Sequence, residues 1–208
     1  MRRLATIVAV LIAAGCGSTV PSNIAPSATT PALVGTASAQ APSTSSASSP
    51  PRATLASPIP VEQGLVDLLP ASVDGLDRQS DASVDAGIAR DPDLAAIARS
   101  FATALYVNPP SGEFAYVSLV RLSRPLENEA YRDYRDSFDQ AACAQAGGRT
   151  GTATGTLGGR SVDIGHCAGG LLTYHLSLDG PIVVSISSLG DRRLGERIIG
   201  ALGDPTPS

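Results

Sequence analysis

Apolar runs in the last third of the chain predict four consecutive β-strands. The runs cover residues 150–157, 160–167, 171–178 and 181–189. Gly158-Gly159, Ala168-Gly169-Gly170 and Asp179-Gly180 separate them, and short glycine-rich connections are typical of β-hairpins. This part of the chain is therefore expected to form an antiparallel four-stranded meander.

A fifth strand and a long amphipathic helix precede the meander. Residues 114–122 are β-rich and nearly all apolar, which predicts a central strand. Pro125 opens a helix to about Gln145, and Gly147-Gly148 ends it. One face of this helix carries Tyr131, Tyr134, Phe138, Ala141 and Ala142, and the other carries Arg132, Asp133, Arg135, Asp136 and Asp139. We expect the aromatic face to be buried and the charged face to be solvated.

The first part of the domain has weaker patterns. A short helix is expected around residues 62–69, and the acidic stretch 80–90 is expected to be a loop. Asp91-Pro92 is a favourable helix start, because Asp caps the helix and Pro fits its first turn. The apolar residues Leu94, Ile97, Ala98, Phe101 and Leu105 then keep a helical period. Residues 103–107 fit a strand equally well.

A last helix is expected near the C-terminus, capped by Asp191, with Leu194, Ile198 and Leu202 facing inward. Together the patterns predict a single α+β domain over residues 61–203, followed by a tail at 204–208. Its expected architecture is a mostly antiparallel sheet with a C-terminal four-stranded meander and helices packed on one face.

The first residues have the features of an export signal. Arg2 and Arg3 precede an apolar run of 11 residues, Leu4 to Ala14, and a bilayer-spanning helix needs about 20. The run ends in Ala13-Ala14-Gly15-Cys16, which resembles the lipobox of bacterial lipoproteins, with Ala13 in place of the preferred Leu. The resemblance implies a signal peptide at 1–15, a fatty-acylated Cys16 and a membrane-anchored chain on the outer face of the cell membrane. Two alternatives are a signal cleaved near Ala39 and a twin-arginine signal.

A linker is expected after the anchor, over residues 16–60. From residue 17 to 60, Ser, Thr, Pro and Ala make up 33 of 44 positions, and there is no aromatic residue. Such a segment buries too little apolar surface to offset its ordering entropy. We expect it to be disordered and to hold the domain away from the membrane.

Charge is concentrated in the domain. Residues 61–208 carry 12 Arg and all 19 acidic residues, which gives a net charge of −7. A net negative domain disfavours nucleic acid and anionic lipid headgroups as main partners.

Cys143 and Cys167 are the two cysteines left after the anchor. In an exported chain such a pair usually forms a disulfide, which would stabilise the fold by roughly 3 kcal/mol. One tension remains: Cys143 points away from the tyrosine face of its helix, and Cys167 lies opposite Val162 and Ile164 on its strand. Either the helix unwinds near Ala141 or the bond lies at the edge of the domain.

The positions of the two histidines in the sequence do not favour a metal site or a catalytic triad. His166 and Cys167 are neighbours on a strand and point to opposite faces, so they do not share a metal. His166 with His175, and Asp163 or Asp179 as a third ligand, is the remaining metal combination. Ser177, His175 and Asp179 lie on one face of one strand, about 7 Å apart, too far for a Ser–His–Asp triad. The sequence therefore predicts no metal, no cofactor and no catalytic residues.

The aromatic residues are candidates for a ligand site. Core packing explains most of them, but Tyr131, Tyr134 and Tyr174 are expected to line a pocket between helix and sheet if there is one. The first hypothesis is thus a module that binds a small apolar ligand or docks on an envelope protein. The alternative is an extracytoplasmic hydrolase acting on cell-wall or lipid substrates. A purely structural accessory is not distinguished from the first hypothesis.

Overall fold

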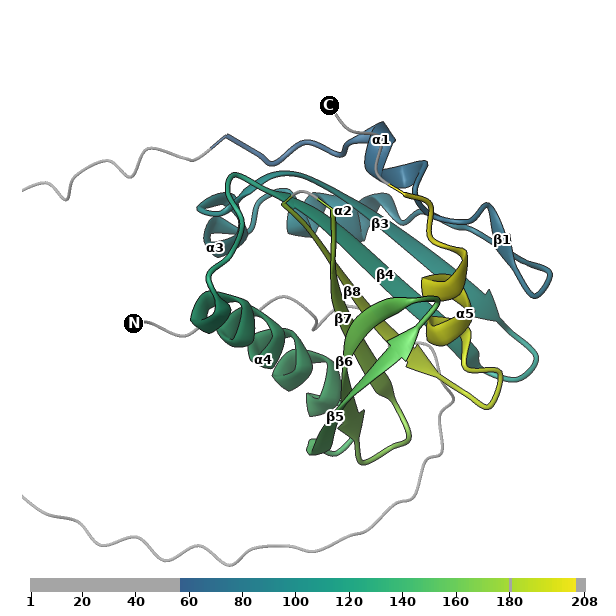
Figure 1. The fold of residues 1–208 in the computed structure, drawn as a ribbon. Coiled ribbons are helices and arrows are strands. Elements are labelled where there is room, and N and C mark those ends of the chain that lie inside the picture. The colour runs from purple at the N-terminus through teal and green to yellow at the C-terminus, as the bar shows by residue number, and fades with distance from the viewer. Residues whose placement is uncertain (1–56, 180, 205–208) are drawn as a thin grey trace, which may run out of the picture. The chain divides into compact units, whose positions relative to one another are not determined.

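A computed structural model describes residues 57–179 and 181–204 (Figure 1). The predicted signal peptide, Cys16 and nearly all of the predicted linker lie outside these residues. The elements in chain order are α1 (Gln63–Val66), β1 (Ser72–Val73), β2 (Leu76–Asp77), α2 (Ala82–Ile88), α3 (Pro92–Ala95), β3 (Ala98–Asn108), β4 (Glu113–Leu122), α4 (Asn128–Ala144), β5 (Arg149–Leu157), β6 (Arg160–Cys167), β7 (Leu172–Leu178), β8 (Ile182–Leu189) and α5 (Leu194–Ala201).

The larger sheet has six strands in the order β3-β4-β8-β7-β6-β5, and all neighbours are antiparallel. The predicted meander is confirmed as β5 to β8, and the predicted central strand is β4, between β3 and β8. Strands β1 and β2 form a separate two-stranded sheet. The α+β class is therefore confirmed.

The helices cover both faces of the large sheet rather than one (Figure 1). Leu194 and Ile198 of α5 pack with Val184 and Ile186 of β8, whereas α4 contributes to clusters with Val183 and Leu189 of the same strand. Alternate residues of a strand point to opposite faces, so α4 and α5 lie on opposite sides. Because β8 is buried at nearly every position, both of its faces are covered. We refer to the two sides as the α4 face and the α5 face.

The segment from 80 to 108 differs from its prediction. Residues 80–90 contain helix α2, which begins where the Asp81 carboxylate accepts hydrogen bonds from the amides of Ser83 and Val84. Asp91 caps α3 as predicted, but α3 ends at Ala95 and β3 begins at Ala98. The prediction of a helix through Leu105 is wrong and the alternative of a strand is right. Long pairing with β4 outweighs the local helical period here.

The two longer helices are confirmed, with corrections to each. Helix α4 begins at Asn128 rather than at Pro125, and Asp139 is fully buried instead of solvated. Leu194, Ile198 and Leu202 are buried as predicted. Asp191 does not cap α5: the residue before the helix is Arg193, with a left-handed φ of 53° and no side-chain cap.

The domain begins slightly before residue 61. Ile59 is buried among residues of the α4 face, and its amide donates to the Ala89 carbonyl at 2.9 Å. The Pro60 carbonyl accepts from the amide of Phe101 at 3.1 Å. A single Ile between prolines leaves no periodic pattern, so its burial had no sequence signal.

The disulfide between Cys143 and Cys167 is confirmed, with 5.1 Å between the two Cα atoms. The expected tension came from placing all helices on one face. Cys167 points to the α4 face, where Cys143 is buried one helical turn after Asp139. Helix α4 continues through Ala144 without unwinding, so the bond fastens the end of α4 to β6.

Candidate functional site

A row of six polar side chains crosses the whole large sheet on the α4 face. Each residue lies directly opposite the next in the strand register. From β3 to β5 the row is Thr103, Ser118, Ser185, His175, Asp163 and Thr154. We call this set the polar row. It lies on the α4 face because Asp163 pairs with Arg135 of α4 at 3.2 Å.

Four of the six side chains in the polar row are buried. Thr103, Ser118, Ser185 and His175 are all buried, and a buried polar group without a partner costs several kcal/mol. Thr103 finds its partner in Asp85 of α2, to which its hydroxyl donates. The row is thus bonded at one end by α2 and at the other by α4.

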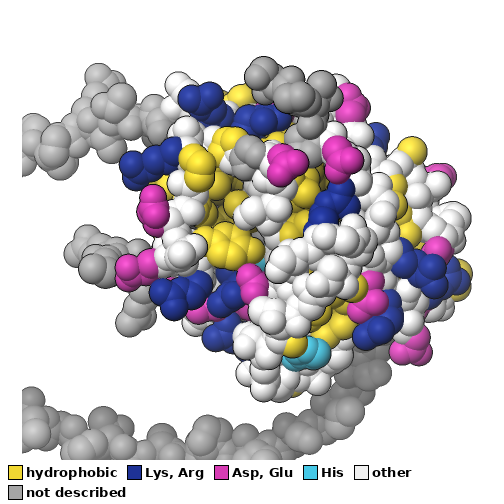
Figure 2. Space-filling model, viewed as in Figure 1, with side chains coloured by type: hydrophobic (Ala, Val, Ile, Leu, Met, Phe, Trp, Pro, Cys, Tyr) yellow, Lys and Arg dark blue, Asp and Glu magenta, His cyan; other side chains and the backbone are white. Residues whose placement is uncertain are grey.

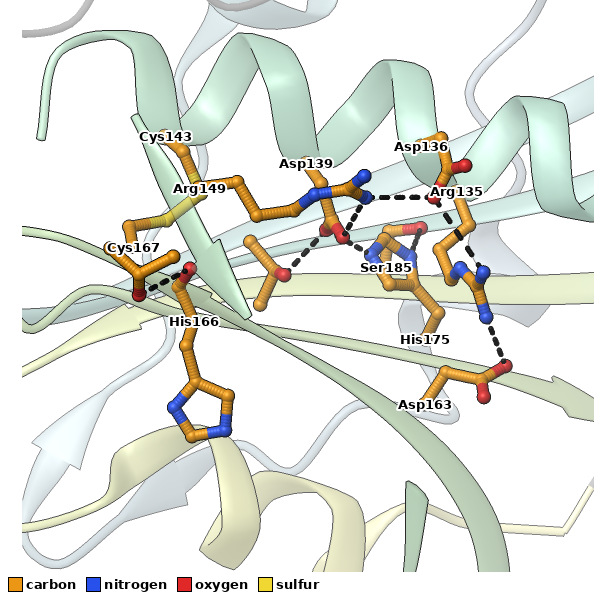
Figure 3. A network of polar contacts seen from close by, with 12 residues as sticks. Arg135, Asp136, Asp139, Cys143, Arg149, Asp163, His166, Cys167, His175 and Ser185 are labelled. Carbon is orange, nitrogen blue, oxygen red and sulfur yellow. Dashed lines mark hydrogen bonds and ion pairs between the residues drawn. A yellow bond between two sulfur atoms is a disulfide. The ribbon is translucent and has the colours of Figure 1, made fainter. Parts of the chain in front are cut away.

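The centre of the row is a buried Asp–His–Ser chain (Figure 3). His175 Nε2 lies 2.8 Å from Asp139 Oδ1, and His175 Nδ1 lies 3.0 Å from Ser185 Oγ. A carboxylate accepts hydrogen bonds, so Nε2 carries the proton that is shared with Asp139. All three side chains are 0% exposed. Asp139 is supplied by α4, His175 by β7 and Ser185 by β8.

The fold leaves a space for the Asp139 carboxylate. A Cβ on Gly165 of β6 would lie 2.7 Å from Asp139 Oδ2, so a larger residue does not fit there. Burial alone would raise the pKa of Asp139, but hydrogen bonds from His175 and Thr173 and the positive charge of Arg149 outweigh it, and the pKa is lowered. Asp139 is therefore an ionised acceptor that fastens α4 to the sheet.

Two arginines extend the network between α4 and the sheet. Arg149 Nη1 lies 2.8 Å from Asp136 Oδ1 and 3.5 Å from Asp139 Oδ2. Arg135 lies 3.6 Å from Asp136 and 3.2 Å from Asp163. These ion pairs join α4 to both β5 and β6. Figure 3 shows them running from the disulfide to Asp163.

The Asp–His–Ser chain has the residue types of a catalytic triad but lacks two things a triad needs. Ser185 is in the middle of β8, with β4 and β7 paired on its two sides, so the amides around it are used by the sheet and are not free to stabilise an oxyanion. Ser185 is also fully buried. This geometry favours a structural role.

The serine and the acid that the sequence suggested as partners of His175 do not contact it. Ser177 and Asp179 are both exposed, and His175 instead contacts Ser185 and Asp139. Ser177 and Asp179 therefore do not pair with His175. Asp139, which is supplied by a distant helix, was not among the residues that the sequence suggested as partners of His175.

Three aromatic side chains on the α4 face are only half-buried. Tyr116, Tyr131 and Tyr134 are only partly buried, together with Val84 of α2 and Leu126. Figure 2 shows hydrophobic side chains in a hollow of this face, surrounded by charged groups. The hydrophobic cluster to which the three tyrosines belong contains residues of α2, α4, β4 and β8. We call its half-exposed part, formed by Tyr116, Tyr131 and Tyr134, the tyrosine opening.

The tyrosine opening connects with the buried chain through Tyr134. The Tyr134 hydroxyl lies 3.4 Å from Ser185 Oγ. Burial raises the pKa of Tyr134, and burial with the nearby charge of Asp163 raises that of Tyr131 to about 12. Both phenols are therefore neutral at physiological pH and serve as hydrogen-bonding groups.

The structure brings together two of the three tyrosines predicted for a ligand site. Tyr131 and Tyr134 belong to one cluster on the α4 face. Tyr174 is fully buried on the α5 face, where Gly195 of α5 leaves room for its ring. Tyr116 takes the third place at the opening.

The metal combination considered in the sequence does not converge. His166 is exposed, and it lies an odd number of residues from Asp163, on the opposite face of β6. His175 is on the α4 face with Asp139. Among residues 57–179 and 181–204, no group of three or more His, Cys, Asp or Glu side chains is arranged to hold a metal ion.

The polar row was not predicted from the sequence, although a signal for it was present. Thr103, Ser118, Ser185 and His175 are each a polar residue within an apolar run. The periodicity within one strand does not reveal which polar residues meet, because the meeting depends on strand order and register. Asp139 lacked even that signal, since it follows a run of solvated charges on its helix.

No protein-family model, curated protein or solved structure matches this chain. In the part of the chain that the structure describes, no helix has the length and apolar character needed to span a membrane.

Proposed function

We propose that the domain binds a small, mostly apolar ligand non-covalently in the tyrosine opening. The observation that carries this proposal is the combination of half-buried tyrosines with the polar row beneath them. Ligand sites are typically apolar concavities with a few well-placed polar groups. The rings of Tyr116, Tyr131 and Tyr134 provide the apolar wall, and the tyrosine hydroxyls together with the hydroxyls of the row provide the polar groups.

The four buried members of the polar row differ slightly in exposure, and this difference guides the proposed position of the ligand. Thr103 and Ser118 keep 7% and 8% of their surface exposed, whereas Ser185 and His175 keep none. A ligand in the opening would thus reach β3 and β4 and remain above the Asp–His–Ser chain. The ligand class we propose is an apolar molecule with one or two hydrogen-bonding groups, such as a lipid or an isoprenoid alcohol.

The alternative function is an extracytoplasmic hydrolase acting on cell-wall or lipid substrates. The contact of Ser185 with His175, and of His175 with Asp139, favours it. Burial of Ser185 and the pairing of β8 on both sides disfavour it. Binding is therefore the first proposal and hydrolysis the second.

One experiment distinguishes the two functions. The full chain is purified from its own cell in mild detergent, analysed by native mass spectrometry and assayed for esterase, amidase and glycosidase turnover. Co-purified apolar ligand without turnover is the expected result. A captured envelope protein and no small molecule would replace ligand binding by docking. Turnover that Ser185→Ala abolishes and Ser177→Ala leaves intact would make the hydrolase the better account.

We further propose that the chain is exported and anchored to the outer face of the cell membrane through a lipid on Cys16. The disulfide between Cys143 and Cys167 supports export, because disulfides persist in oxidising compartments. The lipobox-like residues Ala13 to Cys16 support anchoring. In cells given labelled palmitate, the wild-type chain should take up label and Cys16→Ser should not. Equal labelling of both chains would contradict the anchor.

A further inference from the structure

Strand β5 forms one edge of the large sheet, and its outer side is open. It is the last strand in the order and pairs with β6. Seven of its nine residues are exposed, and Gly155 and Leu157 are half-buried. No described strand lies along the outer side of β5 (Figure 1). Its outward N–H and C=O groups are thus available for another strand.

The opposite edge of the sheet, strand β3, is covered on its outer side. The outer side of β3 bonds to the preceding chain at Phe101, whose carbonyl accepts from the Glu62 amide at 2.8 Å. Farther along, Leu105 and Gln79 exchange two backbone hydrogen bonds of 2.9 Å each. The segment before β3 therefore covers that edge. No described segment does the same for β5.

The register with β6 determines which residues of β5 point outward. Leu157 and Arg160 flank the two-residue turn Gly158-Gly159, whose φ angles of 55° and 78° are typical of a type I′ hairpin. They form a hydrogen-bonded pair, and such pairs alternate along an antiparallel ladder. Thr152, Thr154 and Thr156 therefore direct their backbone N–H and C=O groups away from β6.

The sequence of β5 is self-complementary. Residues 150–156 read Thr-Gly-Thr-Ala-Thr-Gly-Thr, the same in both directions, with Ala153 at the centre. If two copies pair antiparallel about Ala153, Thr152 meets Thr154 and Thr150 meets Thr156. The outward-facing backbone groups then meet one another, as an antiparallel ladder requires. Cross-strand Thr–Thr pairs are favourable.

Within the self-complementary segment of the strand nothing opposes such pairing, and Arg149 at its start is paired with Asp136 and Asp139 of α4. Exposed edge strands are usually protected by charged residues or proline, but residues 150–157 contain neither. Residues 61–208 carry a net charge of −7, so two copies repel each other over most of their charged surface. The uncharged edge of β5 does not add to this repulsion.

We propose that two copies of this chain associate through their β5 edges, antiparallel and centred on Ala153, to form one continuous sheet. The threonine side chains line the α4 face of the joined sheet, and Gly151, Ala153 and Gly155 line the α5 face. The pairing is isologous, as is usual for a two-fold dimer. It is independent of the ligand proposed for the tyrosine opening.

Cysteine cross-linking of the full chain in its own membrane tests the register. Ala153 is the position that meets itself across the two-fold axis, at a Cα separation of about 4.5 Å, which a disulfide spans. Ala153→Cys should give mostly dimer on oxidation and monomer after reduction. Thr156→Cys is the matched control, because its two copies would lie about 20 Å apart along the strands. The parental chain controls for the native cysteines.

Sedimentation of the same full chain in detergent tests the pairing without added cysteine. Thr154→Pro removes an outward N–H and leaves the ladder with β6 intact, so it should weaken dimerisation at least tenfold while circular dichroism stays unchanged. Ser161→Lys is the matched control. It lies on β6, one strand in from the edge, and should leave dimerisation unchanged. A wild-type chain that stays monomeric at 100 μM would overturn the proposal, as would equal cross-linking of Ala153→Cys and Thr156→Cys.

Discussion

On the α5 face of the large sheet, Val117, Val184 and Ile186 meet Leu194 and Ile198 of α5 in an apolar core. On the α4 face the same two strands present Ser118 and Ser185, and the helix above them inserts a carboxylate. Neighbouring residues of a strand point to opposite sides, so a shift of one position along a strand moves from one face to the other. One sheet therefore has an apolar face and a face crossed by polar groups.

This difference indicates how the two faces serve the molecule. Apolar burial on the α5 face stabilises the fold at about 25 cal/mol for each Å² removed from water. The α4 face gains less, because Asp139, His175 and Ser185 must first lose their hydration. Their hydrogen bonds offset that loss and position α4 beside the tyrosine opening. We infer that the α5 face stabilises the domain and the α4 face carries its binding function.

Among the changes that test the difference between the two faces, removal of the Asp139 carboxylate should lower the free energy of unfolding most. Asp139→Ala leaves His175 and Thr173 without their acceptor, and breaking a buried pair from one side costs about 3–5 kcal/mol. Asp136→Ala, one turn earlier and half exposed, should stay within about 0.5 kcal/mol. Urea unfolding measures both free energies. Equal small losses would mean that the Asp–His–Ser chain does not hold α4.

The same variant gives a pH dependence that an apolar substitution does not. The folded-state pKa of Asp139 is lowered, so its contribution to stability is present above its ordinary pKa of about 3.9 and is lost as pH falls through the lower folded value. The cost of Asp139→Ala should therefore shrink in acid. The cost of Ile198→Ala on the α5 face, about 2–5 kcal/mol, should not change with pH. Parallel pH profiles for the two variants would contradict the assignment.

Removing the disulfide should affect the two faces unequally. Changing Cys143 and Cys167 to Ala should lower the free energy of unfolding by about 3 kcal/mol. Because the bond fastens the end of α4, amides of α4 should exchange faster with deuterium while those of α5 stay protected. Uniform loss of protection over both helices would show that the faces do not behave separately.

The smallest stability effect concerns the N-terminal boundary. A fragment of residues 57–204 should be more stable than one of 61–204 by about 1.5–3 kcal/mol, because only the longer fragment buries Ile59 on the α4 face. Ile59→Asn in the longer fragment should reproduce most of the loss. Equal unfolding midpoints for the two fragments would assign Ile59 to the linker.

The sequence predicts the elements of this fold better than their arrangement. Runs such as 181–189 and hairpin glycines such as Gly158 determine local structure, and the meander followed from them. The distribution of helices over two faces depends on long-range packing and was missed. Residues 94–105 show the same limit: their helical period was real, but pairing of β3 with β4 decided their structure.

The candidate site was predictable only in part. Tyr131 and Tyr134 share a helical face, so their common position followed from periodicity. Tyr116 and Tyr174 are on strands, and which face each one takes depends on register. The contact between His175 and Asp139 joins residues 36 positions apart, and no local pattern encodes it. The polar row is therefore a property of the assembled sheet.

The most direct test of ligand binding on the α4 face is a fluorescence titration of the full chain with N-phenyl-1-naphthylamine, an apolar amine. We predict saturable binding at one site per chain. Tyr131→Phe and Tyr134→Phe should each weaken it about fivefold, since a lost hydrogen bond is worth about 1 kcal/mol. Tyr174→Phe, on the α5 face, should leave affinity unchanged. Absence of saturable binding, or an equal loss with Tyr174→Phe, would contradict the account.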